Sequence, residues 1–177
     1  DDREVQTIWR LLDYIGVDYR GAVANGQVVN EPEFAEMTEF SAAVGRRLAA
    51  LPASSQRTDL QRQAQTLKEA IAAKASPTTV ADTAQRLAAA LLTAYPVPLA
   101  PARVPDLNRG AVLYAAHCAS CHGELGDGKG PAAARLDPPP IDFTDLARAR
   151  LRSTFALYQV IGQGLDGTAM PGFTSLS

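Results

Sequence analysis

Two cysteines and a histidine lie close together near residue 120 of this 177-residue chain. Cys118, Cys121 and His122 form the pattern Cys-x-x-Cys-His. Thiols about one helical turn apart can each add to a vinyl group of the same porphyrin, and the histidine that follows is then held beneath the iron. The spacing therefore predicts covalent attachment of c-type haem, with His122 as the proximal ligand.

Other cysteine sites share parts of this pattern. A thioredoxin-like redox pair needs a βαβ setting, whereas the sequence here predicts a helix before Cys118 and a glycine-rich loop after His122. A structural zinc site needs four ligands, and the four candidates between His117 and His122 lie too close together for a normal tetrahedral cage. The chain has no other cysteine for a disulfide. Covalent haem is the favoured interpretation.

A methionine near the end of the chain is a second candidate ligand. Met170 lies in Thr-Ala-Met-Pro-Gly-Phe, after a segment that contains Gly162, Gly164 and Gly167. Its thioether is a soft ligand that binds iron opposite histidine in cytochromes c. A methionine can instead fill a gap in a core, but a core methionine is usually on a regular element. We therefore predict that Met170 is the axial ligand and assign Met37, the only other methionine, to a helix core.

The composition indicates a globular protein with balanced charge. Hydrophobic residues make up 46% of the chain, and the formal net charge of −2 gives no electrostatic basis for binding nucleic acid. Abundant alanine and few aromatic residues favour helices. No run approaches the ~18 apolar residues of a membrane span. Because haem is attached covalently outside the cytoplasm, we expect a periplasmic protein with a processed N-terminus, with a membrane tether outside these residues as a further expectation.

Residues 1–95 predict an antiparallel bundle of four helices. Apolar residues recur at steps of three and four over about 4–24, 31–51, 55–75 and 78–95, and the connections are short. Asn30 is expected to cap the second helix. The expected inward positions are Val5, Ile8, Leu12, Ile15, Tyr19, Ala22, Phe34, Met37, Phe40 or Ser41, Val44, Leu48, Leu51, Leu60, Ala64, Leu67, Ile71, Val80, Ala84, Leu87 and Leu91.

Acidic residues gather around the first two predicted helices. Asp13 and Asp18 lie in the first, and Glu36 and Glu39 share a face of the second. Carboxylate oxygens are hard ligands for iron. The segment contains no histidine, so a solvated helix face is the favoured interpretation. An iron site made of these four carboxylates is the alternative.

A proline-rich segment separates the bundle from the remaining chain. Its prolines are Pro96, Pro98, Pro101 and Pro105. Because proline prevents helix and favours extended backbone, we expect a bundle domain at 1–95, a linker at 96–105 and a second domain at 106–177. Helix caps in the second domain are expected at Asp106 or Asn108, at Thr144 or Asp145, and at Ser153 or Thr154.

Residues 106–177 resemble a class I cytochrome c through the motifs A-x-H-C-x-x-C-H-G, G-x-G-x-G-P and G-T-A-M-P-G-F. The resemblance implies one haem c held by thioethers to Cys118 and Cys121. It implies that His122 and Met170 are the axial ligands. It also implies that the Pro131 carbonyl accepts the second N–H of His122, which orients the ring.

The class I resemblance leaves one element without a counterpart. In that family a closing helix follows the methionine loop, and the chain ends where this helix would begin. The expected fold is therefore all-α: a four-helix bundle plus a class I cytochrome c fold without its C-terminal helix. Either the chain is truncated, or the bundle or a partner covers the first cytochrome helix.

The whole arrangement is similar to the periplasmic N-terminal region of bacterial cytochrome c/Ftr-type iron permeases. Four segments carry the similarity: LLDYIGVDYRGAV (11–23), EFAEMTEF (33–40), AYPVPLAP (94–101) and FALYQVIGQGLDGTAMPGF (155–173). The resemblance implies an electron-transfer module that serves ferrous-iron oxidation and uptake by an associated membrane permease. The permease's membrane helices and iron motif are absent from these residues.

Several functional hypotheses remain open at this point. A haem ligated by histidine and methionine has no open position, which favours an electron carrier over a catalyst, with ferrous iron or a redox protein as its partner. A labile Met170 would instead open the iron for peroxidase-like or oxidase-like chemistry. An electron carrier for an unrelated respiratory oxidoreductase and an iron-binding role for the bundle are the further alternatives.

Overall fold

A computed structural model describes residues 2–98, 101, 103–165 and 167–176. The chain forms two compact units, Asp1–Pro98 (unit 1) and Leu99–Ser177 (unit 2). The division falls within the predicted linker at 96–105. Helices dominate both units, and the strands of the described residues form one two-stranded sheet. The expected all-α class is confirmed.

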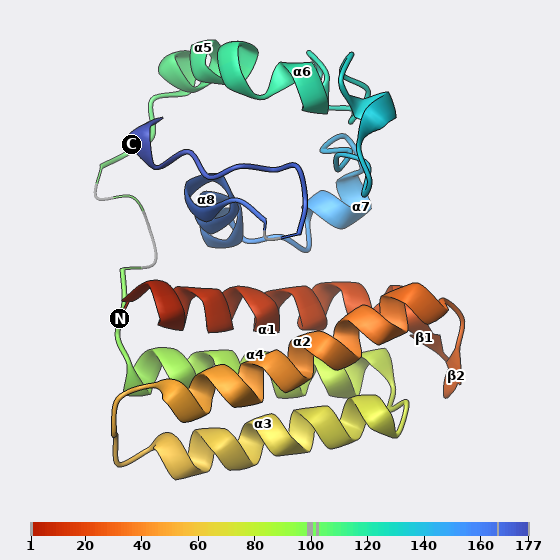
Figure 1. Cartoon of the computed structure of the whole chain (residues 1–177), viewed down its shortest axis with the longest axis vertical. Helices are drawn as coiled ribbons and strands as arrows, with labels where there is room; N and C mark the ends of the chain where they lie inside the picture. The colour runs from red at the N-terminus through yellow and green to blue at the C-terminus, as the bar shows by residue number, and fades with distance from the viewer. Residues whose placement is uncertain (1, 99–100, 102, 166, 177) are drawn as a thin grey trace. The chain divides into compact units, whose positions relative to one another are not determined.

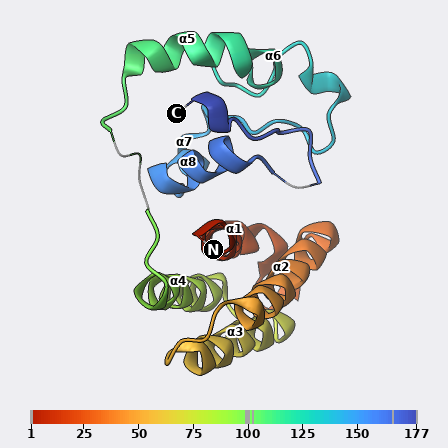
Figure 2. The ribbon, with the colours of Figure 1, turned by 60° about the vertical axis from the view of Figure 1, so that its left-hand side comes forward.

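Unit 1 is a bundle of four long helices (Figure 1). Their bounds are α1 Asp2–Ala22, α2 Glu31–Ala50, α3 Arg57–Ala72 and α4 Pro77–Ala94. Helix α1 packs against α2 and α4, and α3 also packs against α2 and α4, so the helices form a ring of four neighbours. Figure 2 shows this arrangement from a second direction. Short connections between sequential neighbours produce the predicted antiparallel bundle.

The core of unit 1 is built from the predicted apolar stripes. A single cluster of 19 buried hydrophobic residues fills the bundle. Every expected inward residue of α1, α3 and α4 is buried. In α2, Ser41 is buried, whereas Phe34 and Phe40 are half-buried at the edge of the cluster. Hydrophobic periodicity therefore predicted which face of each helix enters the core.

Side-chain hydrogen bonds fix the starts of α2 and α4 and join α2 to α1. Asn30 Oδ1 accepts the N–H of Glu33 at 3.2 Å, as expected for the cap of α2. Ser76 Oγ accepts the N–H of Thr79 at 3.2 Å at the start of α4. The Arg47 guanidinium donates to both carboxylate oxygens of Glu4, at 2.8 and 2.9 Å, and so ties α2 to α1.

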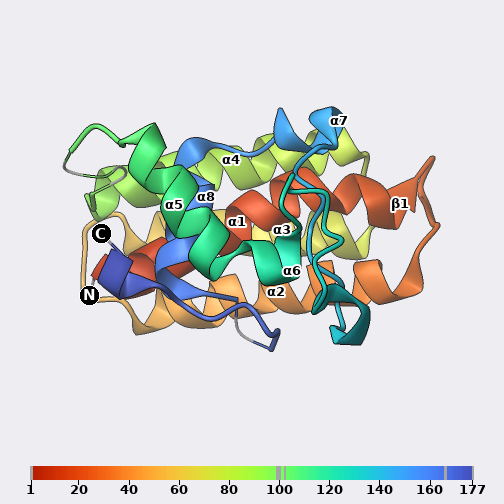
Figure 3. The ribbon, with the colours of Figure 1, turned by 90° about the horizontal axis from the view of Figure 1, so that it is seen from above.

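A small hairpin joins α1 to α2 and lies at one end of the bundle (Figure 3). Strand β1 (Val23–Ala24) pairs antiparallel with β2 (Gln27–Val28). Asn25 and Gly26 form the connection with φ angles of 52° and 73°. Asn-Gly suits a two-residue turn because both positions need positive φ. The same pair also suits the end of a helix, where the first predicted helix stops at about residue 24.

Unit 2 consists of shorter elements joined by loops. They are α5 Leu107–His117, α6 Ala119–His122, the 3-10 turn η1 Ala133–Arg135, α7 Leu146–Ala149, α8 Thr154–Gln163 and the 3-10 turn η2 Thr174–Leu176. Asp106, Asp145 and Ser153 cap α5, α7 and α8, which decides between the expected alternatives. In Figures 1 and 2, α5 and α6 run along one side of unit 2 and α8 along the other. Among the described residues, no helix is both long and apolar enough to cross a membrane.

The Asn30 cap gives a test of the bundle fold. Replacing Asn30→Ala removes the acceptor for the Glu33 N–H, so the free energy of unfolding of unit 1 should fall by about 1 kcal/mol. Trp9, the only tryptophan of the chain, packs against the bundle core, so its fluorescence reports urea unfolding of this unit. The exposed Gln85→Ala is the control and should change stability by less than about 0.5 kcal/mol. Equal stability of the two variants would contradict the cap.

Candidate functional site

The Cys-x-x-Cys-His segment forms a single helical turn at the end of α5. The N–H groups of Cys121 and His122 both donate to the carbonyl of Cys118, at 3.1 and 2.9 Å. This turn places the two sulfur-bearing side chains at neighbouring helix positions. Both cysteines are free and half-buried. Burial, and secondarily the nearby Cys121, raises the pKa of the Cys118 thiol above its ordinary value.

The glycine-rich loop after His122 holds this turn by its backbone. Three loop N–H groups donate to the last three carbonyls of α6: Gly128 to His122 at 2.8 Å, Gly130 to Cys121 at 3.1 Å, and Ala132 to Ser120 at 2.9 Å. Carbonyls at a helix C-terminus have no partner within the helix. The loop supplies these partners and so fixes the segment that carries both thiols and the imidazole.

Close backbone approach explains one of the loop glycines. A Cβ atom on Gly130 would lie 2.4 Å from the carbonyl oxygen of Ser120 and 2.6 Å from that of Ala119. Any side chain would therefore push the loop away from α6. The Tyr114 hydroxyl adds a further tie because it donates to the carbonyl of Gly123 at 2.7 Å. Burial raises the pKa of Tyr114, so the phenol remains a donor.

The imidazole of His122 contacts a distant part of unit 2. Its Nδ1 lies 3.4 Å from the carbonyl oxygen of Ile141, and its ring stacks on Phe143 with centroids 4.7 Å apart and planes inclined by 17°. Pro131 was the expected acceptor, but among the described residues the carbonyl at hydrogen-bond distance from Nδ1 is that of Ile141.

Met170 lies in a loop that folds back onto the end of α8. The Leu165 N–H donates to the Met170 carbonyl at 3.0 Å, and the Met170 N–H donates to Thr168 Oγ1 at 3.1 Å. Gly164, with φ of 73°, permits this return because its Cβ would lie 2.6 Å from the Met170 carbonyl oxygen. These contacts give the half-buried Met170 a defined backbone position.

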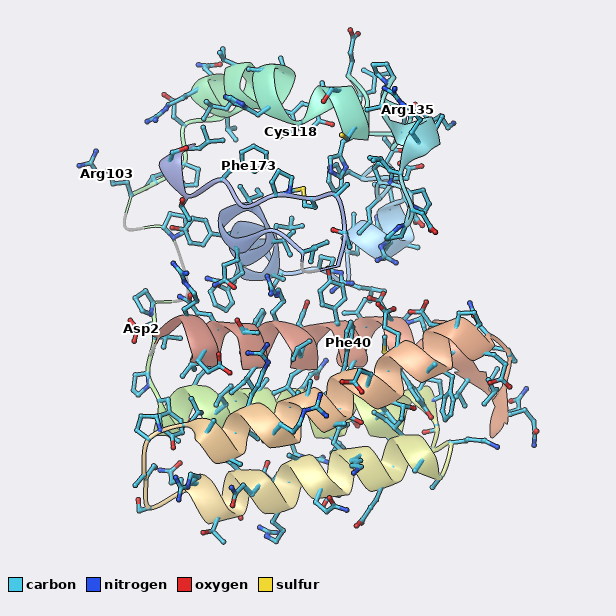
Figure 4. All side chains as sticks on the ribbon, in the orientation of Figure 1. Asp2, Phe40, Arg103, Cys118, Arg135 and Phe173 are labelled. Carbon is cyan, nitrogen blue, oxygen red and sulfur yellow. The ribbon has the colours of Figure 1, made fainter. Side chains whose placement is uncertain are left out.

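Aromatic contact joins the methionine loop to the cysteine segment. The rings of His117 and Phe173 are 6.0 Å apart and inclined by 55°. His117 directly precedes Cys118, and Phe173 follows Met170 by three residues. Figure 4 labels Cys118 at the end of α5, and Phe173 from the loop that follows α8. This contact places the residue before Cys118 close to the segment that follows Met170.

The side chains of unit 2 fit a covalently bound haem. Two free thiols, an imidazole and a thioether are the groups that attach and ligate haem in cytochromes c. Unit 2 also lacks a core of its own: among the described residues, Ala156 is its one buried hydrophobic residue. Leu157, Tyr158 and Ile161 on α8 remain 38–47% exposed. A large apolar group in this unit would cover such side chains.

The acidic set of the bundle is divided between two helices. Asp13 and Asp18 lie on α1, and Glu36 and Glu39 lie on α2. Glu39 forms an exposed ion pair with Arg46 at 2.6 Å. In the described part of the chain, no group of three or more His, Cys, Asp or Glu residues is placed to hold a metal ion. An iron site in the bundle stays a prediction.

Ile141 and Phe143 were not among the predicted site residues. Pro138, Pro139 and Pro140 favour extended backbone before these residues, but they do not indicate which part of the chain the segment contacts. The contact with His122 spans 19 residues and depends on how the intervening loop folds. An aromatic residue three positions after the last proline of the run was the available signal, and it does not specify a partner.

The hydrogen bonds between the glycine-rich loop and α6 can be tested with variants of two glycines. Gly130→Ala forces the loop away from the Ser120 carbonyl, so the amide hydrogens of Gly128 and Ala132 should exchange with solvent faster, measured by NMR. Gly110→Ala is the matched control because a Cβ there meets no atom within 4 Å. That variant should leave the exchange of both amides unchanged. Unaltered protection in Gly130→Ala would show that the close approach is unnecessary.

Comparisons with known families assign each unit. Residues 1–98 match the iron permease-associated 4-helix bundle domain, and residues 105–177 match the cbb3-type cytochrome c oxidase subunit III family. No curated protein and no solved structure matches the chain. The cytochrome family implies covalent haem c and electron transfer, and the bundle family links the chain to an iron permease. Both are consistent with a location outside the cytoplasm. The expected arrangement is confirmed: the chain belongs to the iron permease-associated four-helix bundle family and carries a cytochrome c domain after the bundle.

Proposed function

We propose that this protein is a periplasmic electron-transfer module that accepts electrons from ferrous iron on behalf of an associated iron permease. Cys118 and Cys121 attach one haem c, and His122 and Met170 ligate its iron. The observation that carries the proposal is the folded methionine loop, which is bonded to α8 and contacts the end of α5 through Phe173 and His117. The two family matches support the connection to iron.

The residues of unit 2 have distinct tasks in this function. A haem held by His122 and Met170 would supply one-electron transfer and would leave no position for a substrate to bind the iron. The α6 turn holds the two thiols and the imidazole in one rigid segment, since the glycine loop satisfies its carbonyls. The bonds of Leu165 and Thr168 to Met170 shape the methionine loop, and the Phe173 N–H, which donates to the Ile161 carbonyl at 2.8 Å, joins the loop to α8.

The electron balance of the proposed reaction is one to one. Each ferrous ion loses one electron and becomes ferric, and each protein molecule takes up one electron. A redox partner protein then removes that electron and restores the oxidised form. The permease is the proposed acceptor of the ferric product, since the bundle belongs to a permease-associated family. A separate part of the proposal is that the carboxylates of Asp13, Asp18, Glu36 and Glu39 attract ferrous iron to the protein.

Removing the thioether tests the axial assignment. Met170→Ala should keep the covalent haem but allow carbon monoxide to bind the reduced protein, and the reduction potential should fall by part of the ~0.8 V range that axial ligands span. Met37→Leu is the control because Met37 is buried in the bundle core, and both properties should match wild type. Optical spectra with and without carbon monoxide provide the measurement. Equally ready binding to wild type would favour a haem enzyme with a labile methionine.

Ferrous iron itself tests the proposed electron source. When oxidised protein is mixed anaerobically with ferrous iron, one haem should be reduced for each iron ion oxidised. Stopped-flow absorbance measures this reaction. If the carboxylates guide iron, a variant with Asp13→Asn, Asp18→Asn, Glu36→Gln and Glu39→Gln should react more slowly. Reduction by ascorbate is the control for an intact haem in both proteins. Reduction by ascorbate but never by ferrous iron would assign the carrier to another respiratory oxidoreductase.

A further inference from the structure

Helices α2 and α3 lie side by side in unit 1 (Figure 1) and leave an open groove of about 400 Å³ between them. We call it the α2/α3 groove. Its volume is in the range of sites that hold small molecules. Part of its lining is made of the small residues Ala42 and Gly45 of α2 and Ala64 of α3. The predicted haem-binding residues belong to unit 2, so this groove is a separate feature of the bundle.

Gly45 keeps part of the α2/α3 groove open. It lies in the interior of α2, where glycine is less favourable than alanine because its backbone loses more conformational freedom on folding. A Cβ atom on Gly45 would meet no atom of a neighbouring element within 4 Å. The packing of α2 therefore does not require glycine at this position. The glycine instead leaves space in the groove, although it weakens the helix.

Two cations line the groove, one from each helix. Within the described part of the chain, its charged lining residues are Arg46 of α2 and Lys68 of α3. Lys68 is exposed and forms no ion pair with another described residue. Arg46 Nη2 donates to Glu39 Oε1 at 2.6 Å, but both side chains are more than 60% exposed. An exposed pair of this kind is weak, and the guanidinium has further N–H donors, so a second anion can share or replace Glu39.

Amide side chains add neutral donors to the two cations. Gln61 and Gln65 lie one helical turn apart on α3, and both line the groove. Gln65 Nε2 donates to Glu69 Oε1 at 2.8 Å, which leaves the amide of Gln61 as the half-exposed donor of the pair. Cations and amides suit negatively charged oxygens. The apolar surface of Ala42 and Ala64 suits a carbon body, which an inorganic anion lacks.

We propose that the α2/α3 groove binds a small polycarboxylate, a molecule with two or more carboxylates on a short carbon body. Arg46 pairs with one carboxylate, and Lys68 pairs with another from the facing helix. The Gln61 amide donates to the ligand, whose carbon body contacts Ala64. Gly45 provides the room that the ligand occupies. This inference involves neither haem nor electron transfer, so its failure would leave the proposed function untouched.

NMR of the nitrogen-15-labelled full chain, titrated with citrate, tests the site. Citrate is the probe because it has three carboxylates on a short carbon chain. We expect saturable shift changes that are confined to the backbone amides of 41–46 and 61–68. Inorganic phosphate at the same ionic strength should change these signals less. Changes that do not saturate, that lie elsewhere, or that phosphate reproduces with equal affinity would overturn the proposal.

Two pairs of variants should separate loss of the site from general effects. Gly45→Leu fills the open space and should abolish citrate binding, whereas Gly21→Leu, at an equally open helix position outside the groove, should bind citrate as wild type does. Lys68→Met should weaken binding by about threefold. Lys74→Met removes the same charge from an exposed lysine outside the groove and should have no effect. Equal affinities within either pair would contradict the site.

Removing a competing carboxylate should strengthen binding. Glu39→Gln releases the Arg46 guanidinium from its ion pair, so the dissociation constant of citrate should fall by about threefold. Glu36→Gln removes the same charge from an exposed position on the same helix and is the matched control, with the wild-type constant expected. A damaged fold would not bind citrate more tightly, so the gain is specific to the groove. If Glu39→Gln binds citrate no better than Glu36→Gln, Arg46 is not a ligand group and the proposal is wrong.

Discussion

The short helix α6 depends on hydrogen bonds from outside itself. One turn of helix fixes several residues for very few internal bonds, so a four-residue helix is unstable alone. The N–H groups of Gly128, Gly130 and Ala132 compensate by bonding to its last three carbonyls. The same loop positions Phe143 through Gly126. The orientation of the thiols and of His122 therefore depends on a close approach of the loop to α6 that only glycine permits at Gly130.

The two units are stabilised in different ways. Unit 1 buries a continuous apolar cluster, so its helices are stable because they cover one another's faces. Unit 2 is maintained by caps, turns and glycine contacts, and its α8 leaves Leu157 and Ile161 exposed. Anything apolar that binds only the folded form of unit 2 adds to its stability by mass action. Haem attachment would therefore be coupled to folding in unit 2 and independent of folding in unit 1.

Features with a local physical cause could be predicted from the sequence. The helices of unit 1 follow from apolar periodicity, and the Asn30 cap follows from side-chain chemistry within three residues. The Asn25–Gly26 hairpin also had a local signal, but the pair suits both a helix end and a tight turn. The contacts of His122 with Ile141 and Phe143 had no such signal, because they depend on how a 19-residue loop closes. The loop position of Met170 could be predicted from its glycine-rich context, whereas the bonds that hold the loop could not, and its role as a ligand stays a prediction.

The anchoring of the methionine loop has a consequence for the speed of electron exchange. The Phe173 N–H donates to the Ile161 carbonyl of α8, and the Leu165 N–H donates to the Met170 carbonyl within the loop. These bonds hold the loop on both sides of Met170. If Met170 ligates the haem iron as proposed, a backbone fixed in this way lets the ligand shift little when the charge on the metal changes. Little nuclear movement means a small reorganisation energy, and polar groups already in position lower the barrier to a change of charge. The left-handed backbone at Gly164 would then serve the rate of electron transfer as well as the shape of the fold.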